Sequence, residues 1–253
     1  MNYYFGLKNS IFSSEIQIPF FKNKETKPKN ILLYKASILN NVWKIEKINN
    51  NKISPEFFII KSNDHSNSDI FFLAHPNEVQ NLDINKLTNI NDYTETSPAY
   101  RANLKIIFKN GGFSSYQSEY PYSMIKKKGS ILSSVHSLAN IDADSNYIFI
   151  KNIYERPIHK IFNCFLVNIK TKKIEEKFEI KTNFTNFIEL NKKLIRPEIF
   201  LSTKEFLGIP IYASVKNKHV SFEHTHPLHE YVLSKDKFTI IGNLKKEINE
   251  ITS

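Results

Sequence analysis

Short runs of β-branched and aromatic residues, separated by clusters of polar turn residues, constrain the fold of this chain most. Turn clusters lie at 22–30, 49–54, 62–68, 109–112 and 170–173. Between them, runs that alternate or are continuously apolar predict strands at 31–39, 41–48, 55–60, 69–74, 102–108, 146–150, 162–169, 174–180, 186–190, 209–214, 219–226 and 237–241. Many short strands with turns at near-regular intervals indicate an all-β protein, with an antiparallel β-sandwich as the expected architecture.

Helical signals are few and short. A capping-box pattern at 202–205, followed by Gly208, predicts a single turn. The segment 130–138 is a second candidate helix. Near the end, Leu244, Ile248 and Ile251 recur at helical spacing after Gly242, which predicts a short amphipathic C-terminal helix. All three are expected to pack on the core.

One segment is a candidate linker between two parts of the chain. Residues 89–98 are rich in Thr and Asn and show no hydrophobic periodicity. The predicted organisation is therefore an N-terminal mainly-β region over 1–97 and a larger β-sandwich domain over 98–253 that ends in the short helix.

The basic charge is better explained by the amino-acid usage of an AT-rich genome, which favours Lys, Asn and Ile, than by a polyanion partner. The chain has 35 Lys+Arg against 25 Asp+Glu, a formal net charge of +10. Only Arg101, Arg156 and Arg196 are arginines, the residue that recognises phosphate and guanine best. The lysines are scattered and the densest run is 126–128, so we expect no nucleic-acid partner.

No stretch of the sequence predicts a membrane span, and we expect a cytoplasmic protein. The apolar runs are far shorter than the ~20 residues that cross a bilayer. The first residues lack the pattern of a secretory signal. The single cysteine, Cys164, excludes an internal disulfide and fits a reduced compartment.

Part of the second region resembles the immunoglobulin-like sandwich domains. The strand, proline, strand, hairpin, strand order is carried by 147–152, Arg156-Pro157-Ile158, 162–170, the turn 170–173, 174–180 and 184–190. The resemblance is one of element order alone, so it implies a fold but no activity. The disulfide and core tryptophan of antibody-type members are absent, because the one Trp, Trp43, lies elsewhere.

Histidines are concentrated near the C-terminus. His219, His224, His226 and His229 fall close together, and Glu230 follows at once. On a strand over 219–226, alternation places His224 and His226 on one face. Imidazoles with a carboxylate are the usual ligands of Zn, Fe, Ni or Mn, so these residues are a candidate metal site.

The sequence His224-Thr225-His226, three further residues and Glu230 resembles the first motif of the cupin family. That resemblance implies that His224, His226 and Glu230 are metal ligands, with His229 as an alternative to Glu230. The glycines of the motif are absent, and too few residues follow for the second motif. Histidines on a strand edge with local hydrogen bonds explain the same pattern.

A tyrosine-rich segment is the candidate ligand site. Tyr116, Gln117, Glu119, Tyr120 and Tyr122 combine rigid amphipathic rings with polar groups, a composition suited to sugars. The alternation also describes an ordinary strand that caps a core, and Pro121 places such a strand at a sheet edge.

Two functions of different classes follow. One is a binding or interaction module for a glycan or protein partner, because no complete catalytic motif is present and aromatic-rich loops serve recognition. Ser133, Ser134 and His136 lack the Gly-x-Ser-x-Gly setting, and Cys164 has a buried-thiol pattern. The other is a metal-dependent enzyme that acts on a small polar or sugar-like substrate through His224 and His226.

Overall fold

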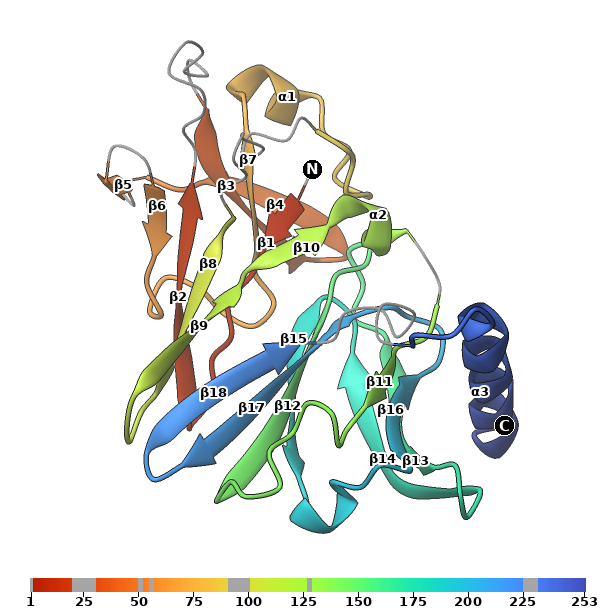
Figure 1. Ribbon diagram of the computed structural model, residues 1–253. Helices are drawn as coiled ribbons and strands as arrows, with labels where there is room; N and C mark the ends of the chain where they lie inside the picture. The colour runs from red at the N-terminus through yellow and green to blue at the C-terminus, as the bar shows by residue number, and fades with distance from the viewer. Residues whose placement is uncertain are drawn as a thin grey trace. The chain divides into compact units, whose positions relative to one another are not determined.

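The computed structural model describes residues 2–19, 31–49, 52–54, 57–90, 101–126, 129–224 and 232–253 (Figure 1). Strand accounts for 48% of the chain and helix for 13%, so the predicted all-β class is confirmed. The described strand pairs are antiparallel. Within the described part of the chain, none of the helices has the length and apolar character needed to cross a bilayer.

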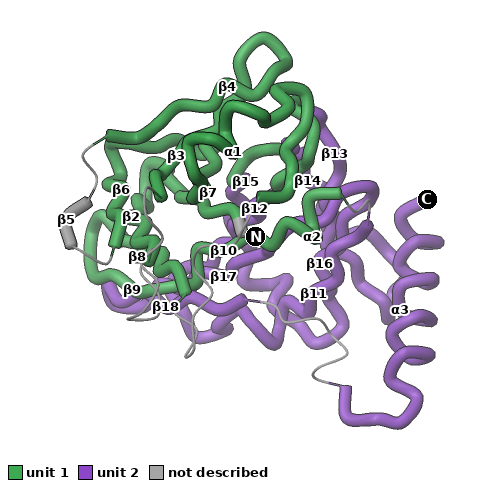
Figure 2. The backbone as a smooth tube through the Cα atoms, turned by 90° about the horizontal axis from the view of Figure 1, so that it is seen from above, with its two compact units in different colours: residues 1–126, 153–159, 183–185 green, residues 127–152, 160–182, 186–253 purple. Residues whose placement is uncertain are grey.

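The chain forms two compact units (Figure 2). The first contains residues 1–126, 153–159 and 183–185, and the second contains 127–152, 160–182 and 186–253. The polypeptide therefore passes from one unit to the other several times. Residues 91–98 of the candidate linker lie outside the described residues. Division at residue 97 into an N-terminal mainly-β region and a β-sandwich domain stays a prediction.

The first unit has two five-stranded sheets. One has the order β10 (Glu119–Pro121), β1 (Asn2–Tyr4), β7 (Ile70–Ala74), β3 (Leu32–Leu39) and β4 (Val42–Lys47). The other has the order β5 (Lys52–Ser54), β6 (Phe57–Ile60), β2 (Phe12–Pro19), β8 (Asn103–Phe108) and β9 (Phe113–Gln117). We call the second of these the β2 sheet.

Strand β2 shows why the β2 sheet has one buried and one accessible face. Phe12, Ser14, Ile16 and Ile18 are buried, and the residues between them are partly exposed up to Gln17. Side chains alternate between faces along a strand, so the apolar set faces the core and the polar set faces outward. The neighbouring strand β8 alternates in the same way.

The second unit has two four-stranded sheets. One has the order β11 (Leu132–Ser134), β16 (Ile199–Thr203), β13 (Ile161–Asn168) and β14 (Lys173–Lys181), and the other the order β15 (Phe184–Leu190), β12 (Ser145–Asn152), β17 (Ile209–Lys216) and β18 (His219–His224). The buried hydroxyls of Ser133 and Tyr212 lie 2.9 Å apart and join the two sheets. The arrangement is compatible with a β-sandwich.

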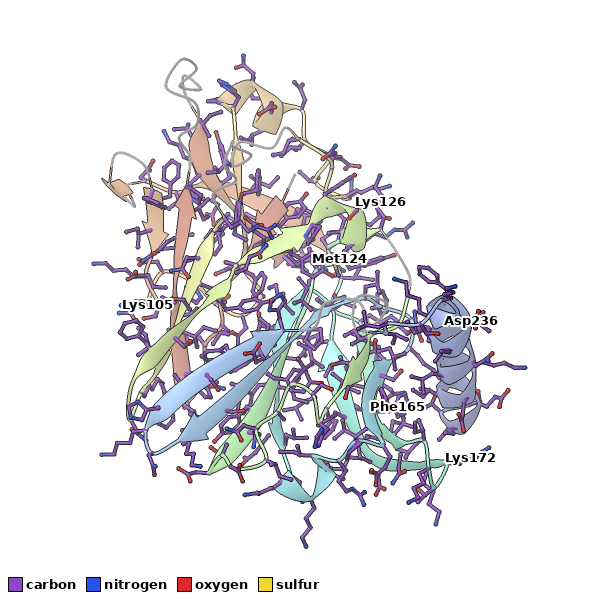
Figure 3. All side chains as sticks on the ribbon, in the orientation of Figure 1. Lys105, Met124, Lys126, Phe165, Lys172 and Asp236 are labelled. Carbon is purple, nitrogen blue, oxygen red and sulfur yellow. The ribbon has the colours of Figure 1, made fainter. Side chains whose placement is uncertain are left out.

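In the described ranges, the helices are short except at the C-terminus. They are α1 (Pro76–Gln80), α2 (Tyr122–Ile125), a 3₁₀ turn at Lys192–Leu194 and α3 (Lys237–Ile251). Ile248 of α3 packs with Phe165 and Val167 of β13, and Leu244 and Ile251 join this cluster (Figure 3). The predicted packing stripe of the C-terminal helix is therefore found on a longer helix.

Three local predictions are wrong. Residues 237–241 are the first turns of α3 and not a strand, because helical packing through Leu244 and Ile248 continues across Gly242. The candidate helix 130–138 contains strand β11, which pairs with β16. The predicted turn after 202–205 is absent, since β16 runs to Thr203 and Glu205 has a positive φ of 76°.

Candidate functional site

The histidine-rich segment is only partly described. His224 is the last residue of β18 and is partly exposed, on the same side as Val220 and Phe222. His226, His229 and Glu230 lie outside the described residues. Among the residues that the structure describes, no group of three or more His, Cys, Asp or Glu side chains is positioned to hold a metal. The metal site stays a prediction.

Two of the candidate ligand tyrosines lie toward the protein interior. Tyr120 is buried and faces Tyr3 across the β10–β1 pair. Burial raises the pKa of Tyr120 and of Tyr116 above the usual value for a phenol. These rings pack, and they are not available as an open platform.

Tyr122 lies apart from Tyr116 in the fold. It begins α2, and its ring centroid is 6.5 Å from that of Tyr3 and 5.0 Å from the Lys126 ammonium. The structure therefore does not bring the five predicted ligand residues onto one face.

Gln117, by contrast, belongs to a polar surface that spans three strands, and Glu119 of β10 is hydrogen-bonded to it. Gln17 of β2 pairs in register with Asn103 of β8, and Asn103 pairs with Gln117 of β9. All three side chains are on the outward face of the β2 sheet and are partly exposed. We call these three carboxamides the amide row.

Hydrogen bonds orient one end of the amide row. Asn103 Nδ2 donates to Gln17 Oε1 at 3.1 Å, and Gln17 Nε2 donates to Glu15 Oε1 at 2.9 Å. Each amide nitrogen carries two protons, so each of these two bonds uses one and leaves another.

The other end of the row is held by ionic groups. Arg101 Nη1 donates to Gln117 Oε1 at 2.8 Å, and Gln117 Nε2 donates to Glu119 Oε2 at 2.7 Å. Glu119 Oε1 also accepts the backbone N–H of Ala102 at 3.0 Å. The amide planes are therefore fixed before any ligand arrives.

An aromatic ring lies on the same face, two side-chain rows along from the amide row. Phe113 of β9 is 61% exposed, and the Lys105 ammonium lies 4.3 Å from its centroid. Lys105 pairs in register with Glu15 and Ser115, one row along from the amides (Figure 3). We call the surface formed by these residues the amide face. It consists of the amide row with Glu15, Arg101, Lys105, Phe113, Ser115 and Glu119.

Sequence reasoning missed Gln17 and Asn103, although a signal for Gln17 was present. Ile16, Gln17 and Ile18 alternate in polarity, yet this segment is not among the strands predicted from the sequence. The adjacency of Gln17, Asn103 and Gln117 depends on strand pairing between distant segments, which alternation does not reveal.

A buried serine and histidine lie close together but cannot act as a nucleophile and base. Ser14 Oγ is 3.3 Å from His65 Nε2, and the same nitrogen is 2.9 Å from the Ser14 carbonyl oxygen. A carbonyl only accepts, so Nε2 carries the proton and cannot take one from the hydroxyl. Ser14 Oγ accepts the Leu7 N–H at 2.9 Å, which is a structural role.

The remaining nucleophile candidates are also structural. Cys164 is buried, and burial raises the pKa of its thiol well above the usual range. A thiol of this kind stays protonated and unreactive. Ser133 is fully buried against Tyr212.

Comparison with known proteins adds no relative. No family model, no curated protein and no solved structure matches the chain.

Proposed function

We propose that this protein is a binding protein that takes a neutral carbohydrate chain on the amide face. The observation that supports the proposal is the amide row, in which Gln17, Asn103 and Gln117 lie side by side on three adjacent strands. Neighbouring strands are about 4.8 Å apart, so the row spans about 10 Å. A surface of this length suits a short oligosaccharide better than a single small ligand.

Carboxamides are matched to sugar hydroxyls. Each amide offers a donor and an acceptor side by side, and a hydroxyl can accept from one and donate to the other. The bonds from Asn103 to Gln17 and from Gln17 to Glu15 hold these groups in place. Fixed groups lose little side-chain entropy when a ligand binds.

Phe113 supplies an apolar surface on the same face as the amide row, two side-chain rows away. Its exposed ring can pack against the C–H face of a sugar, as aromatic side chains do in many polar sites. An exposed aromatic ring on the same face as oriented amides is the combination expected for carbohydrate recognition.

Charge balance favours a neutral ligand. Arg101 and Lys105 are matched by Glu15 and Glu119 on the same face. An anionic or cationic chain would gain little net Coulomb attraction here.

A fluorescence titration tests the proposal. Trp43 is buried, so Phe113→Trp places a second, exposed indole at the site. Titration of this variant with a panel of soluble neutral oligosaccharides is expected to shift its emission. In the same variant, Asn103→Ala removes the central amide and is expected to weaken binding roughly two- to tenfold, since a hydrogen-bonded group contributes about 0.5–1.5 kcal/mol. Its loss also removes the bond that orients Gln17.

Asn163→Ala is the matched control. Asn163 is also a partly exposed asparagine on an interior strand, β13, but it lies in the second unit. The control is expected to leave binding unchanged. Equal loss of affinity in both variants, or no emission change with any oligosaccharide, would contradict the proposal.

A further inference from the structure

Four loops lie at one end of the second unit, the lower end in Figure 1. They join β11 to β12, β13 to β14, β15 to β16, and β17 to β18. Pairing registers agree with this placement: Ser145 is opposite Val215, and Asn168 is opposite Ile199 and Lys173. We call this surface the lysine end, after the residues described next.

Exposed lysines from three of these loops and from the strand ends beside them dominate the lysine end. They are Lys170, Lys173, Lys192, Lys193, Lys216 and Lys218. Within the described ranges, no carboxylate forms an ion pair with any of them. Lysines that are scattered in the sequence are thus gathered by the fold.

The acidic groups of this end are few, and some of them form ion pairs. Glu175 and Glu198 pair with Arg196 at 3.1 and 3.7 Å, and Glu247 pairs with Lys172 at 3.6 Å. Three exposed acidic residues remain without an ion pair in the described part of the chain: Asp142, Asp144 and Glu189. Asp144 accepts the N–H of Asn217 at 2.8 Å. The unpaired lysines of this end therefore outnumber its unpaired acidic groups.

Two lysines at this end occupy backbone positions that lysine normally avoids. Lys172 has φ 55° and Lys218 has φ 67°. Left-handed conformations favour Gly or Asn, because the Cβ of other residues crowds the backbone. Both are tips of tight turns where glycine would fit better, so the charge is kept at a conformational cost.

Apolar side chains are exposed among these charges. Ile141, in the loop from β11 to β12, is 48% exposed, and Ile174, at the start of β14, is 40% exposed. Membrane-surface binding combines such side chains, which enter the interface, with lysines that attract anionic headgroups.

We propose that the lysine end docks onto a membrane surface that contains anionic lipids. The phosphate-bearing headgroups face the unpaired lysines, and Ile141 and Ile174 enter the interface. The docking surface is independent of the amide face, which belongs to the other unit.

The composition of the loops favours a lipid surface over a nucleic acid. They contain no Phe, Tyr or Trp on which bases would stack, and their one arginine, Arg196, is paired with glutamates. Lysine acts as a point charge and suits diffuse attraction to a charged plane.

Vesicle sedimentation with the full chain tests the proposal. Vesicles of phosphatidylcholine alone are compared with vesicles that also contain phosphatidylglycerol. A triple variant, Lys170→Gln/Lys192→Gln/Lys193→Gln, removes three charges at the lysine end. The control is Lys47→Gln/Lys61→Gln/Lys177→Gln, which removes three exposed lysines elsewhere. The two variants therefore have the same net charge as each other.

The unmodified chain is expected to sediment only with the phosphatidylglycerol vesicles. Each lysine near an anionic surface contributes about fivefold to partitioning, so the first triple variant should lose roughly 100-fold and the control far less. Equal losses in both variants, or no sedimentation of the unmodified chain, would overturn the proposal. Binding to a homopolymeric RNA that depends on the same lysines, with none to vesicles, would replace it with a nucleic-acid surface.

Lys218→Gly separates the role of this lysine in stability from its role in docking. Glycine relieves the left-handed strain at φ 67°, so the melting temperature is expected to rise by about 2–4 °C. Vesicle binding should fall about fivefold. Asn217→Gly, at the neighbouring turn position, changes no charge and should leave vesicle binding intact. A melting temperature that falls in Lys218→Gly would show that the side chain stabilises the turn.

Discussion

Replacing Asn183 by alanine is expected to lower the free energy of unfolding by about 3–4 kcal/mol. The side chain is fully buried. Its Nδ2 donates to the carbonyl oxygens of Arg156 and Ile158 at 2.8 and 3.0 Å, and its Oδ1 accepts the N–H of Tyr154 at 2.7 Å. Alanine leaves three backbone groups of the segment 153–159 without this partner.

Backbone conformation adds to the cost at the same position. Asn183 has φ 53°, which asparagine tolerates better than alanine. Asn217→Ala is the matched control, because Asn217 has φ 48° but is exposed. It should cost only the conformational part, about 1 kcal/mol. Urea unfolding followed by circular dichroism measures both, and similar values for the two variants would contradict the assigned hydrogen bonds.

The same contacts bear on the sequence Asn183-Phe184-Thr185, which matches a glycosylation acceptor. Both protons of Asn183 Nδ2 are used by buried hydrogen bonds in the folded chain. The folded protein therefore does not present this nitrogen for modification. Here the asparagine of the motif has a structural role, because it holds the backbone of the segment 153–159.

Gly6→Ala is expected to destabilise the first unit by about 3 kcal/mol through steric overlap. A Cβ at Gly6 would lie 2.6 Å from Nδ1 and 2.7 Å from Nε2 of His65, closer than nonbonded atoms approach. The described glycines have no positive φ, so the effect is one of space and not of backbone conformation.

A double-mutant cycle identifies the cause. His65→Ala alone removes the ring that contacts Ser14 and is expected to cost about 2–3 kcal/mol. In His65→Ala/Gly6→Ala the overlap is absent, so the loss should be smaller than the sum of the single losses by about 2 kcal/mol. Additive losses in urea unfolding would mean that alanine at position 6 is tolerated or fails for another reason.

Local patterns predicted the class of the fold well and some elements poorly. Turn clusters such as 170–173 and alternating runs such as 102–108 coincide with hairpins and strands. Strand β2 is not evident from the sequence because the polar Ser14 interrupts its apolar face. In the fold Ser14 is buried, and its hydroxyl accepts the backbone N–H of Leu7. The segment 237–241 was misassigned because short apolar runs fit a strand or a helix equally, and packing of α3 decided it.

The candidate site was only partly within reach of the sequence. Gln117 and Glu119 were identified as polar groups in a ligand segment, but the tyrosines beside them are largely packing residues. Gln17 and Asn103 are far apart in the chain and meet Gln117 only through the pairing of β2, β8 and β9. No local rule selects those partners.

The sequence by itself determined an antiparallel all-β protein, because a side-chain period of two and turn chemistry are local properties that each segment carries alone. Tertiary structure decided which strands became neighbours, and with that the amide row and the lysine end. Strand pairing and register depend on burying apolar faces from distant segments together. The amide face and the lysine end therefore exist only because the strand order brings their residues together.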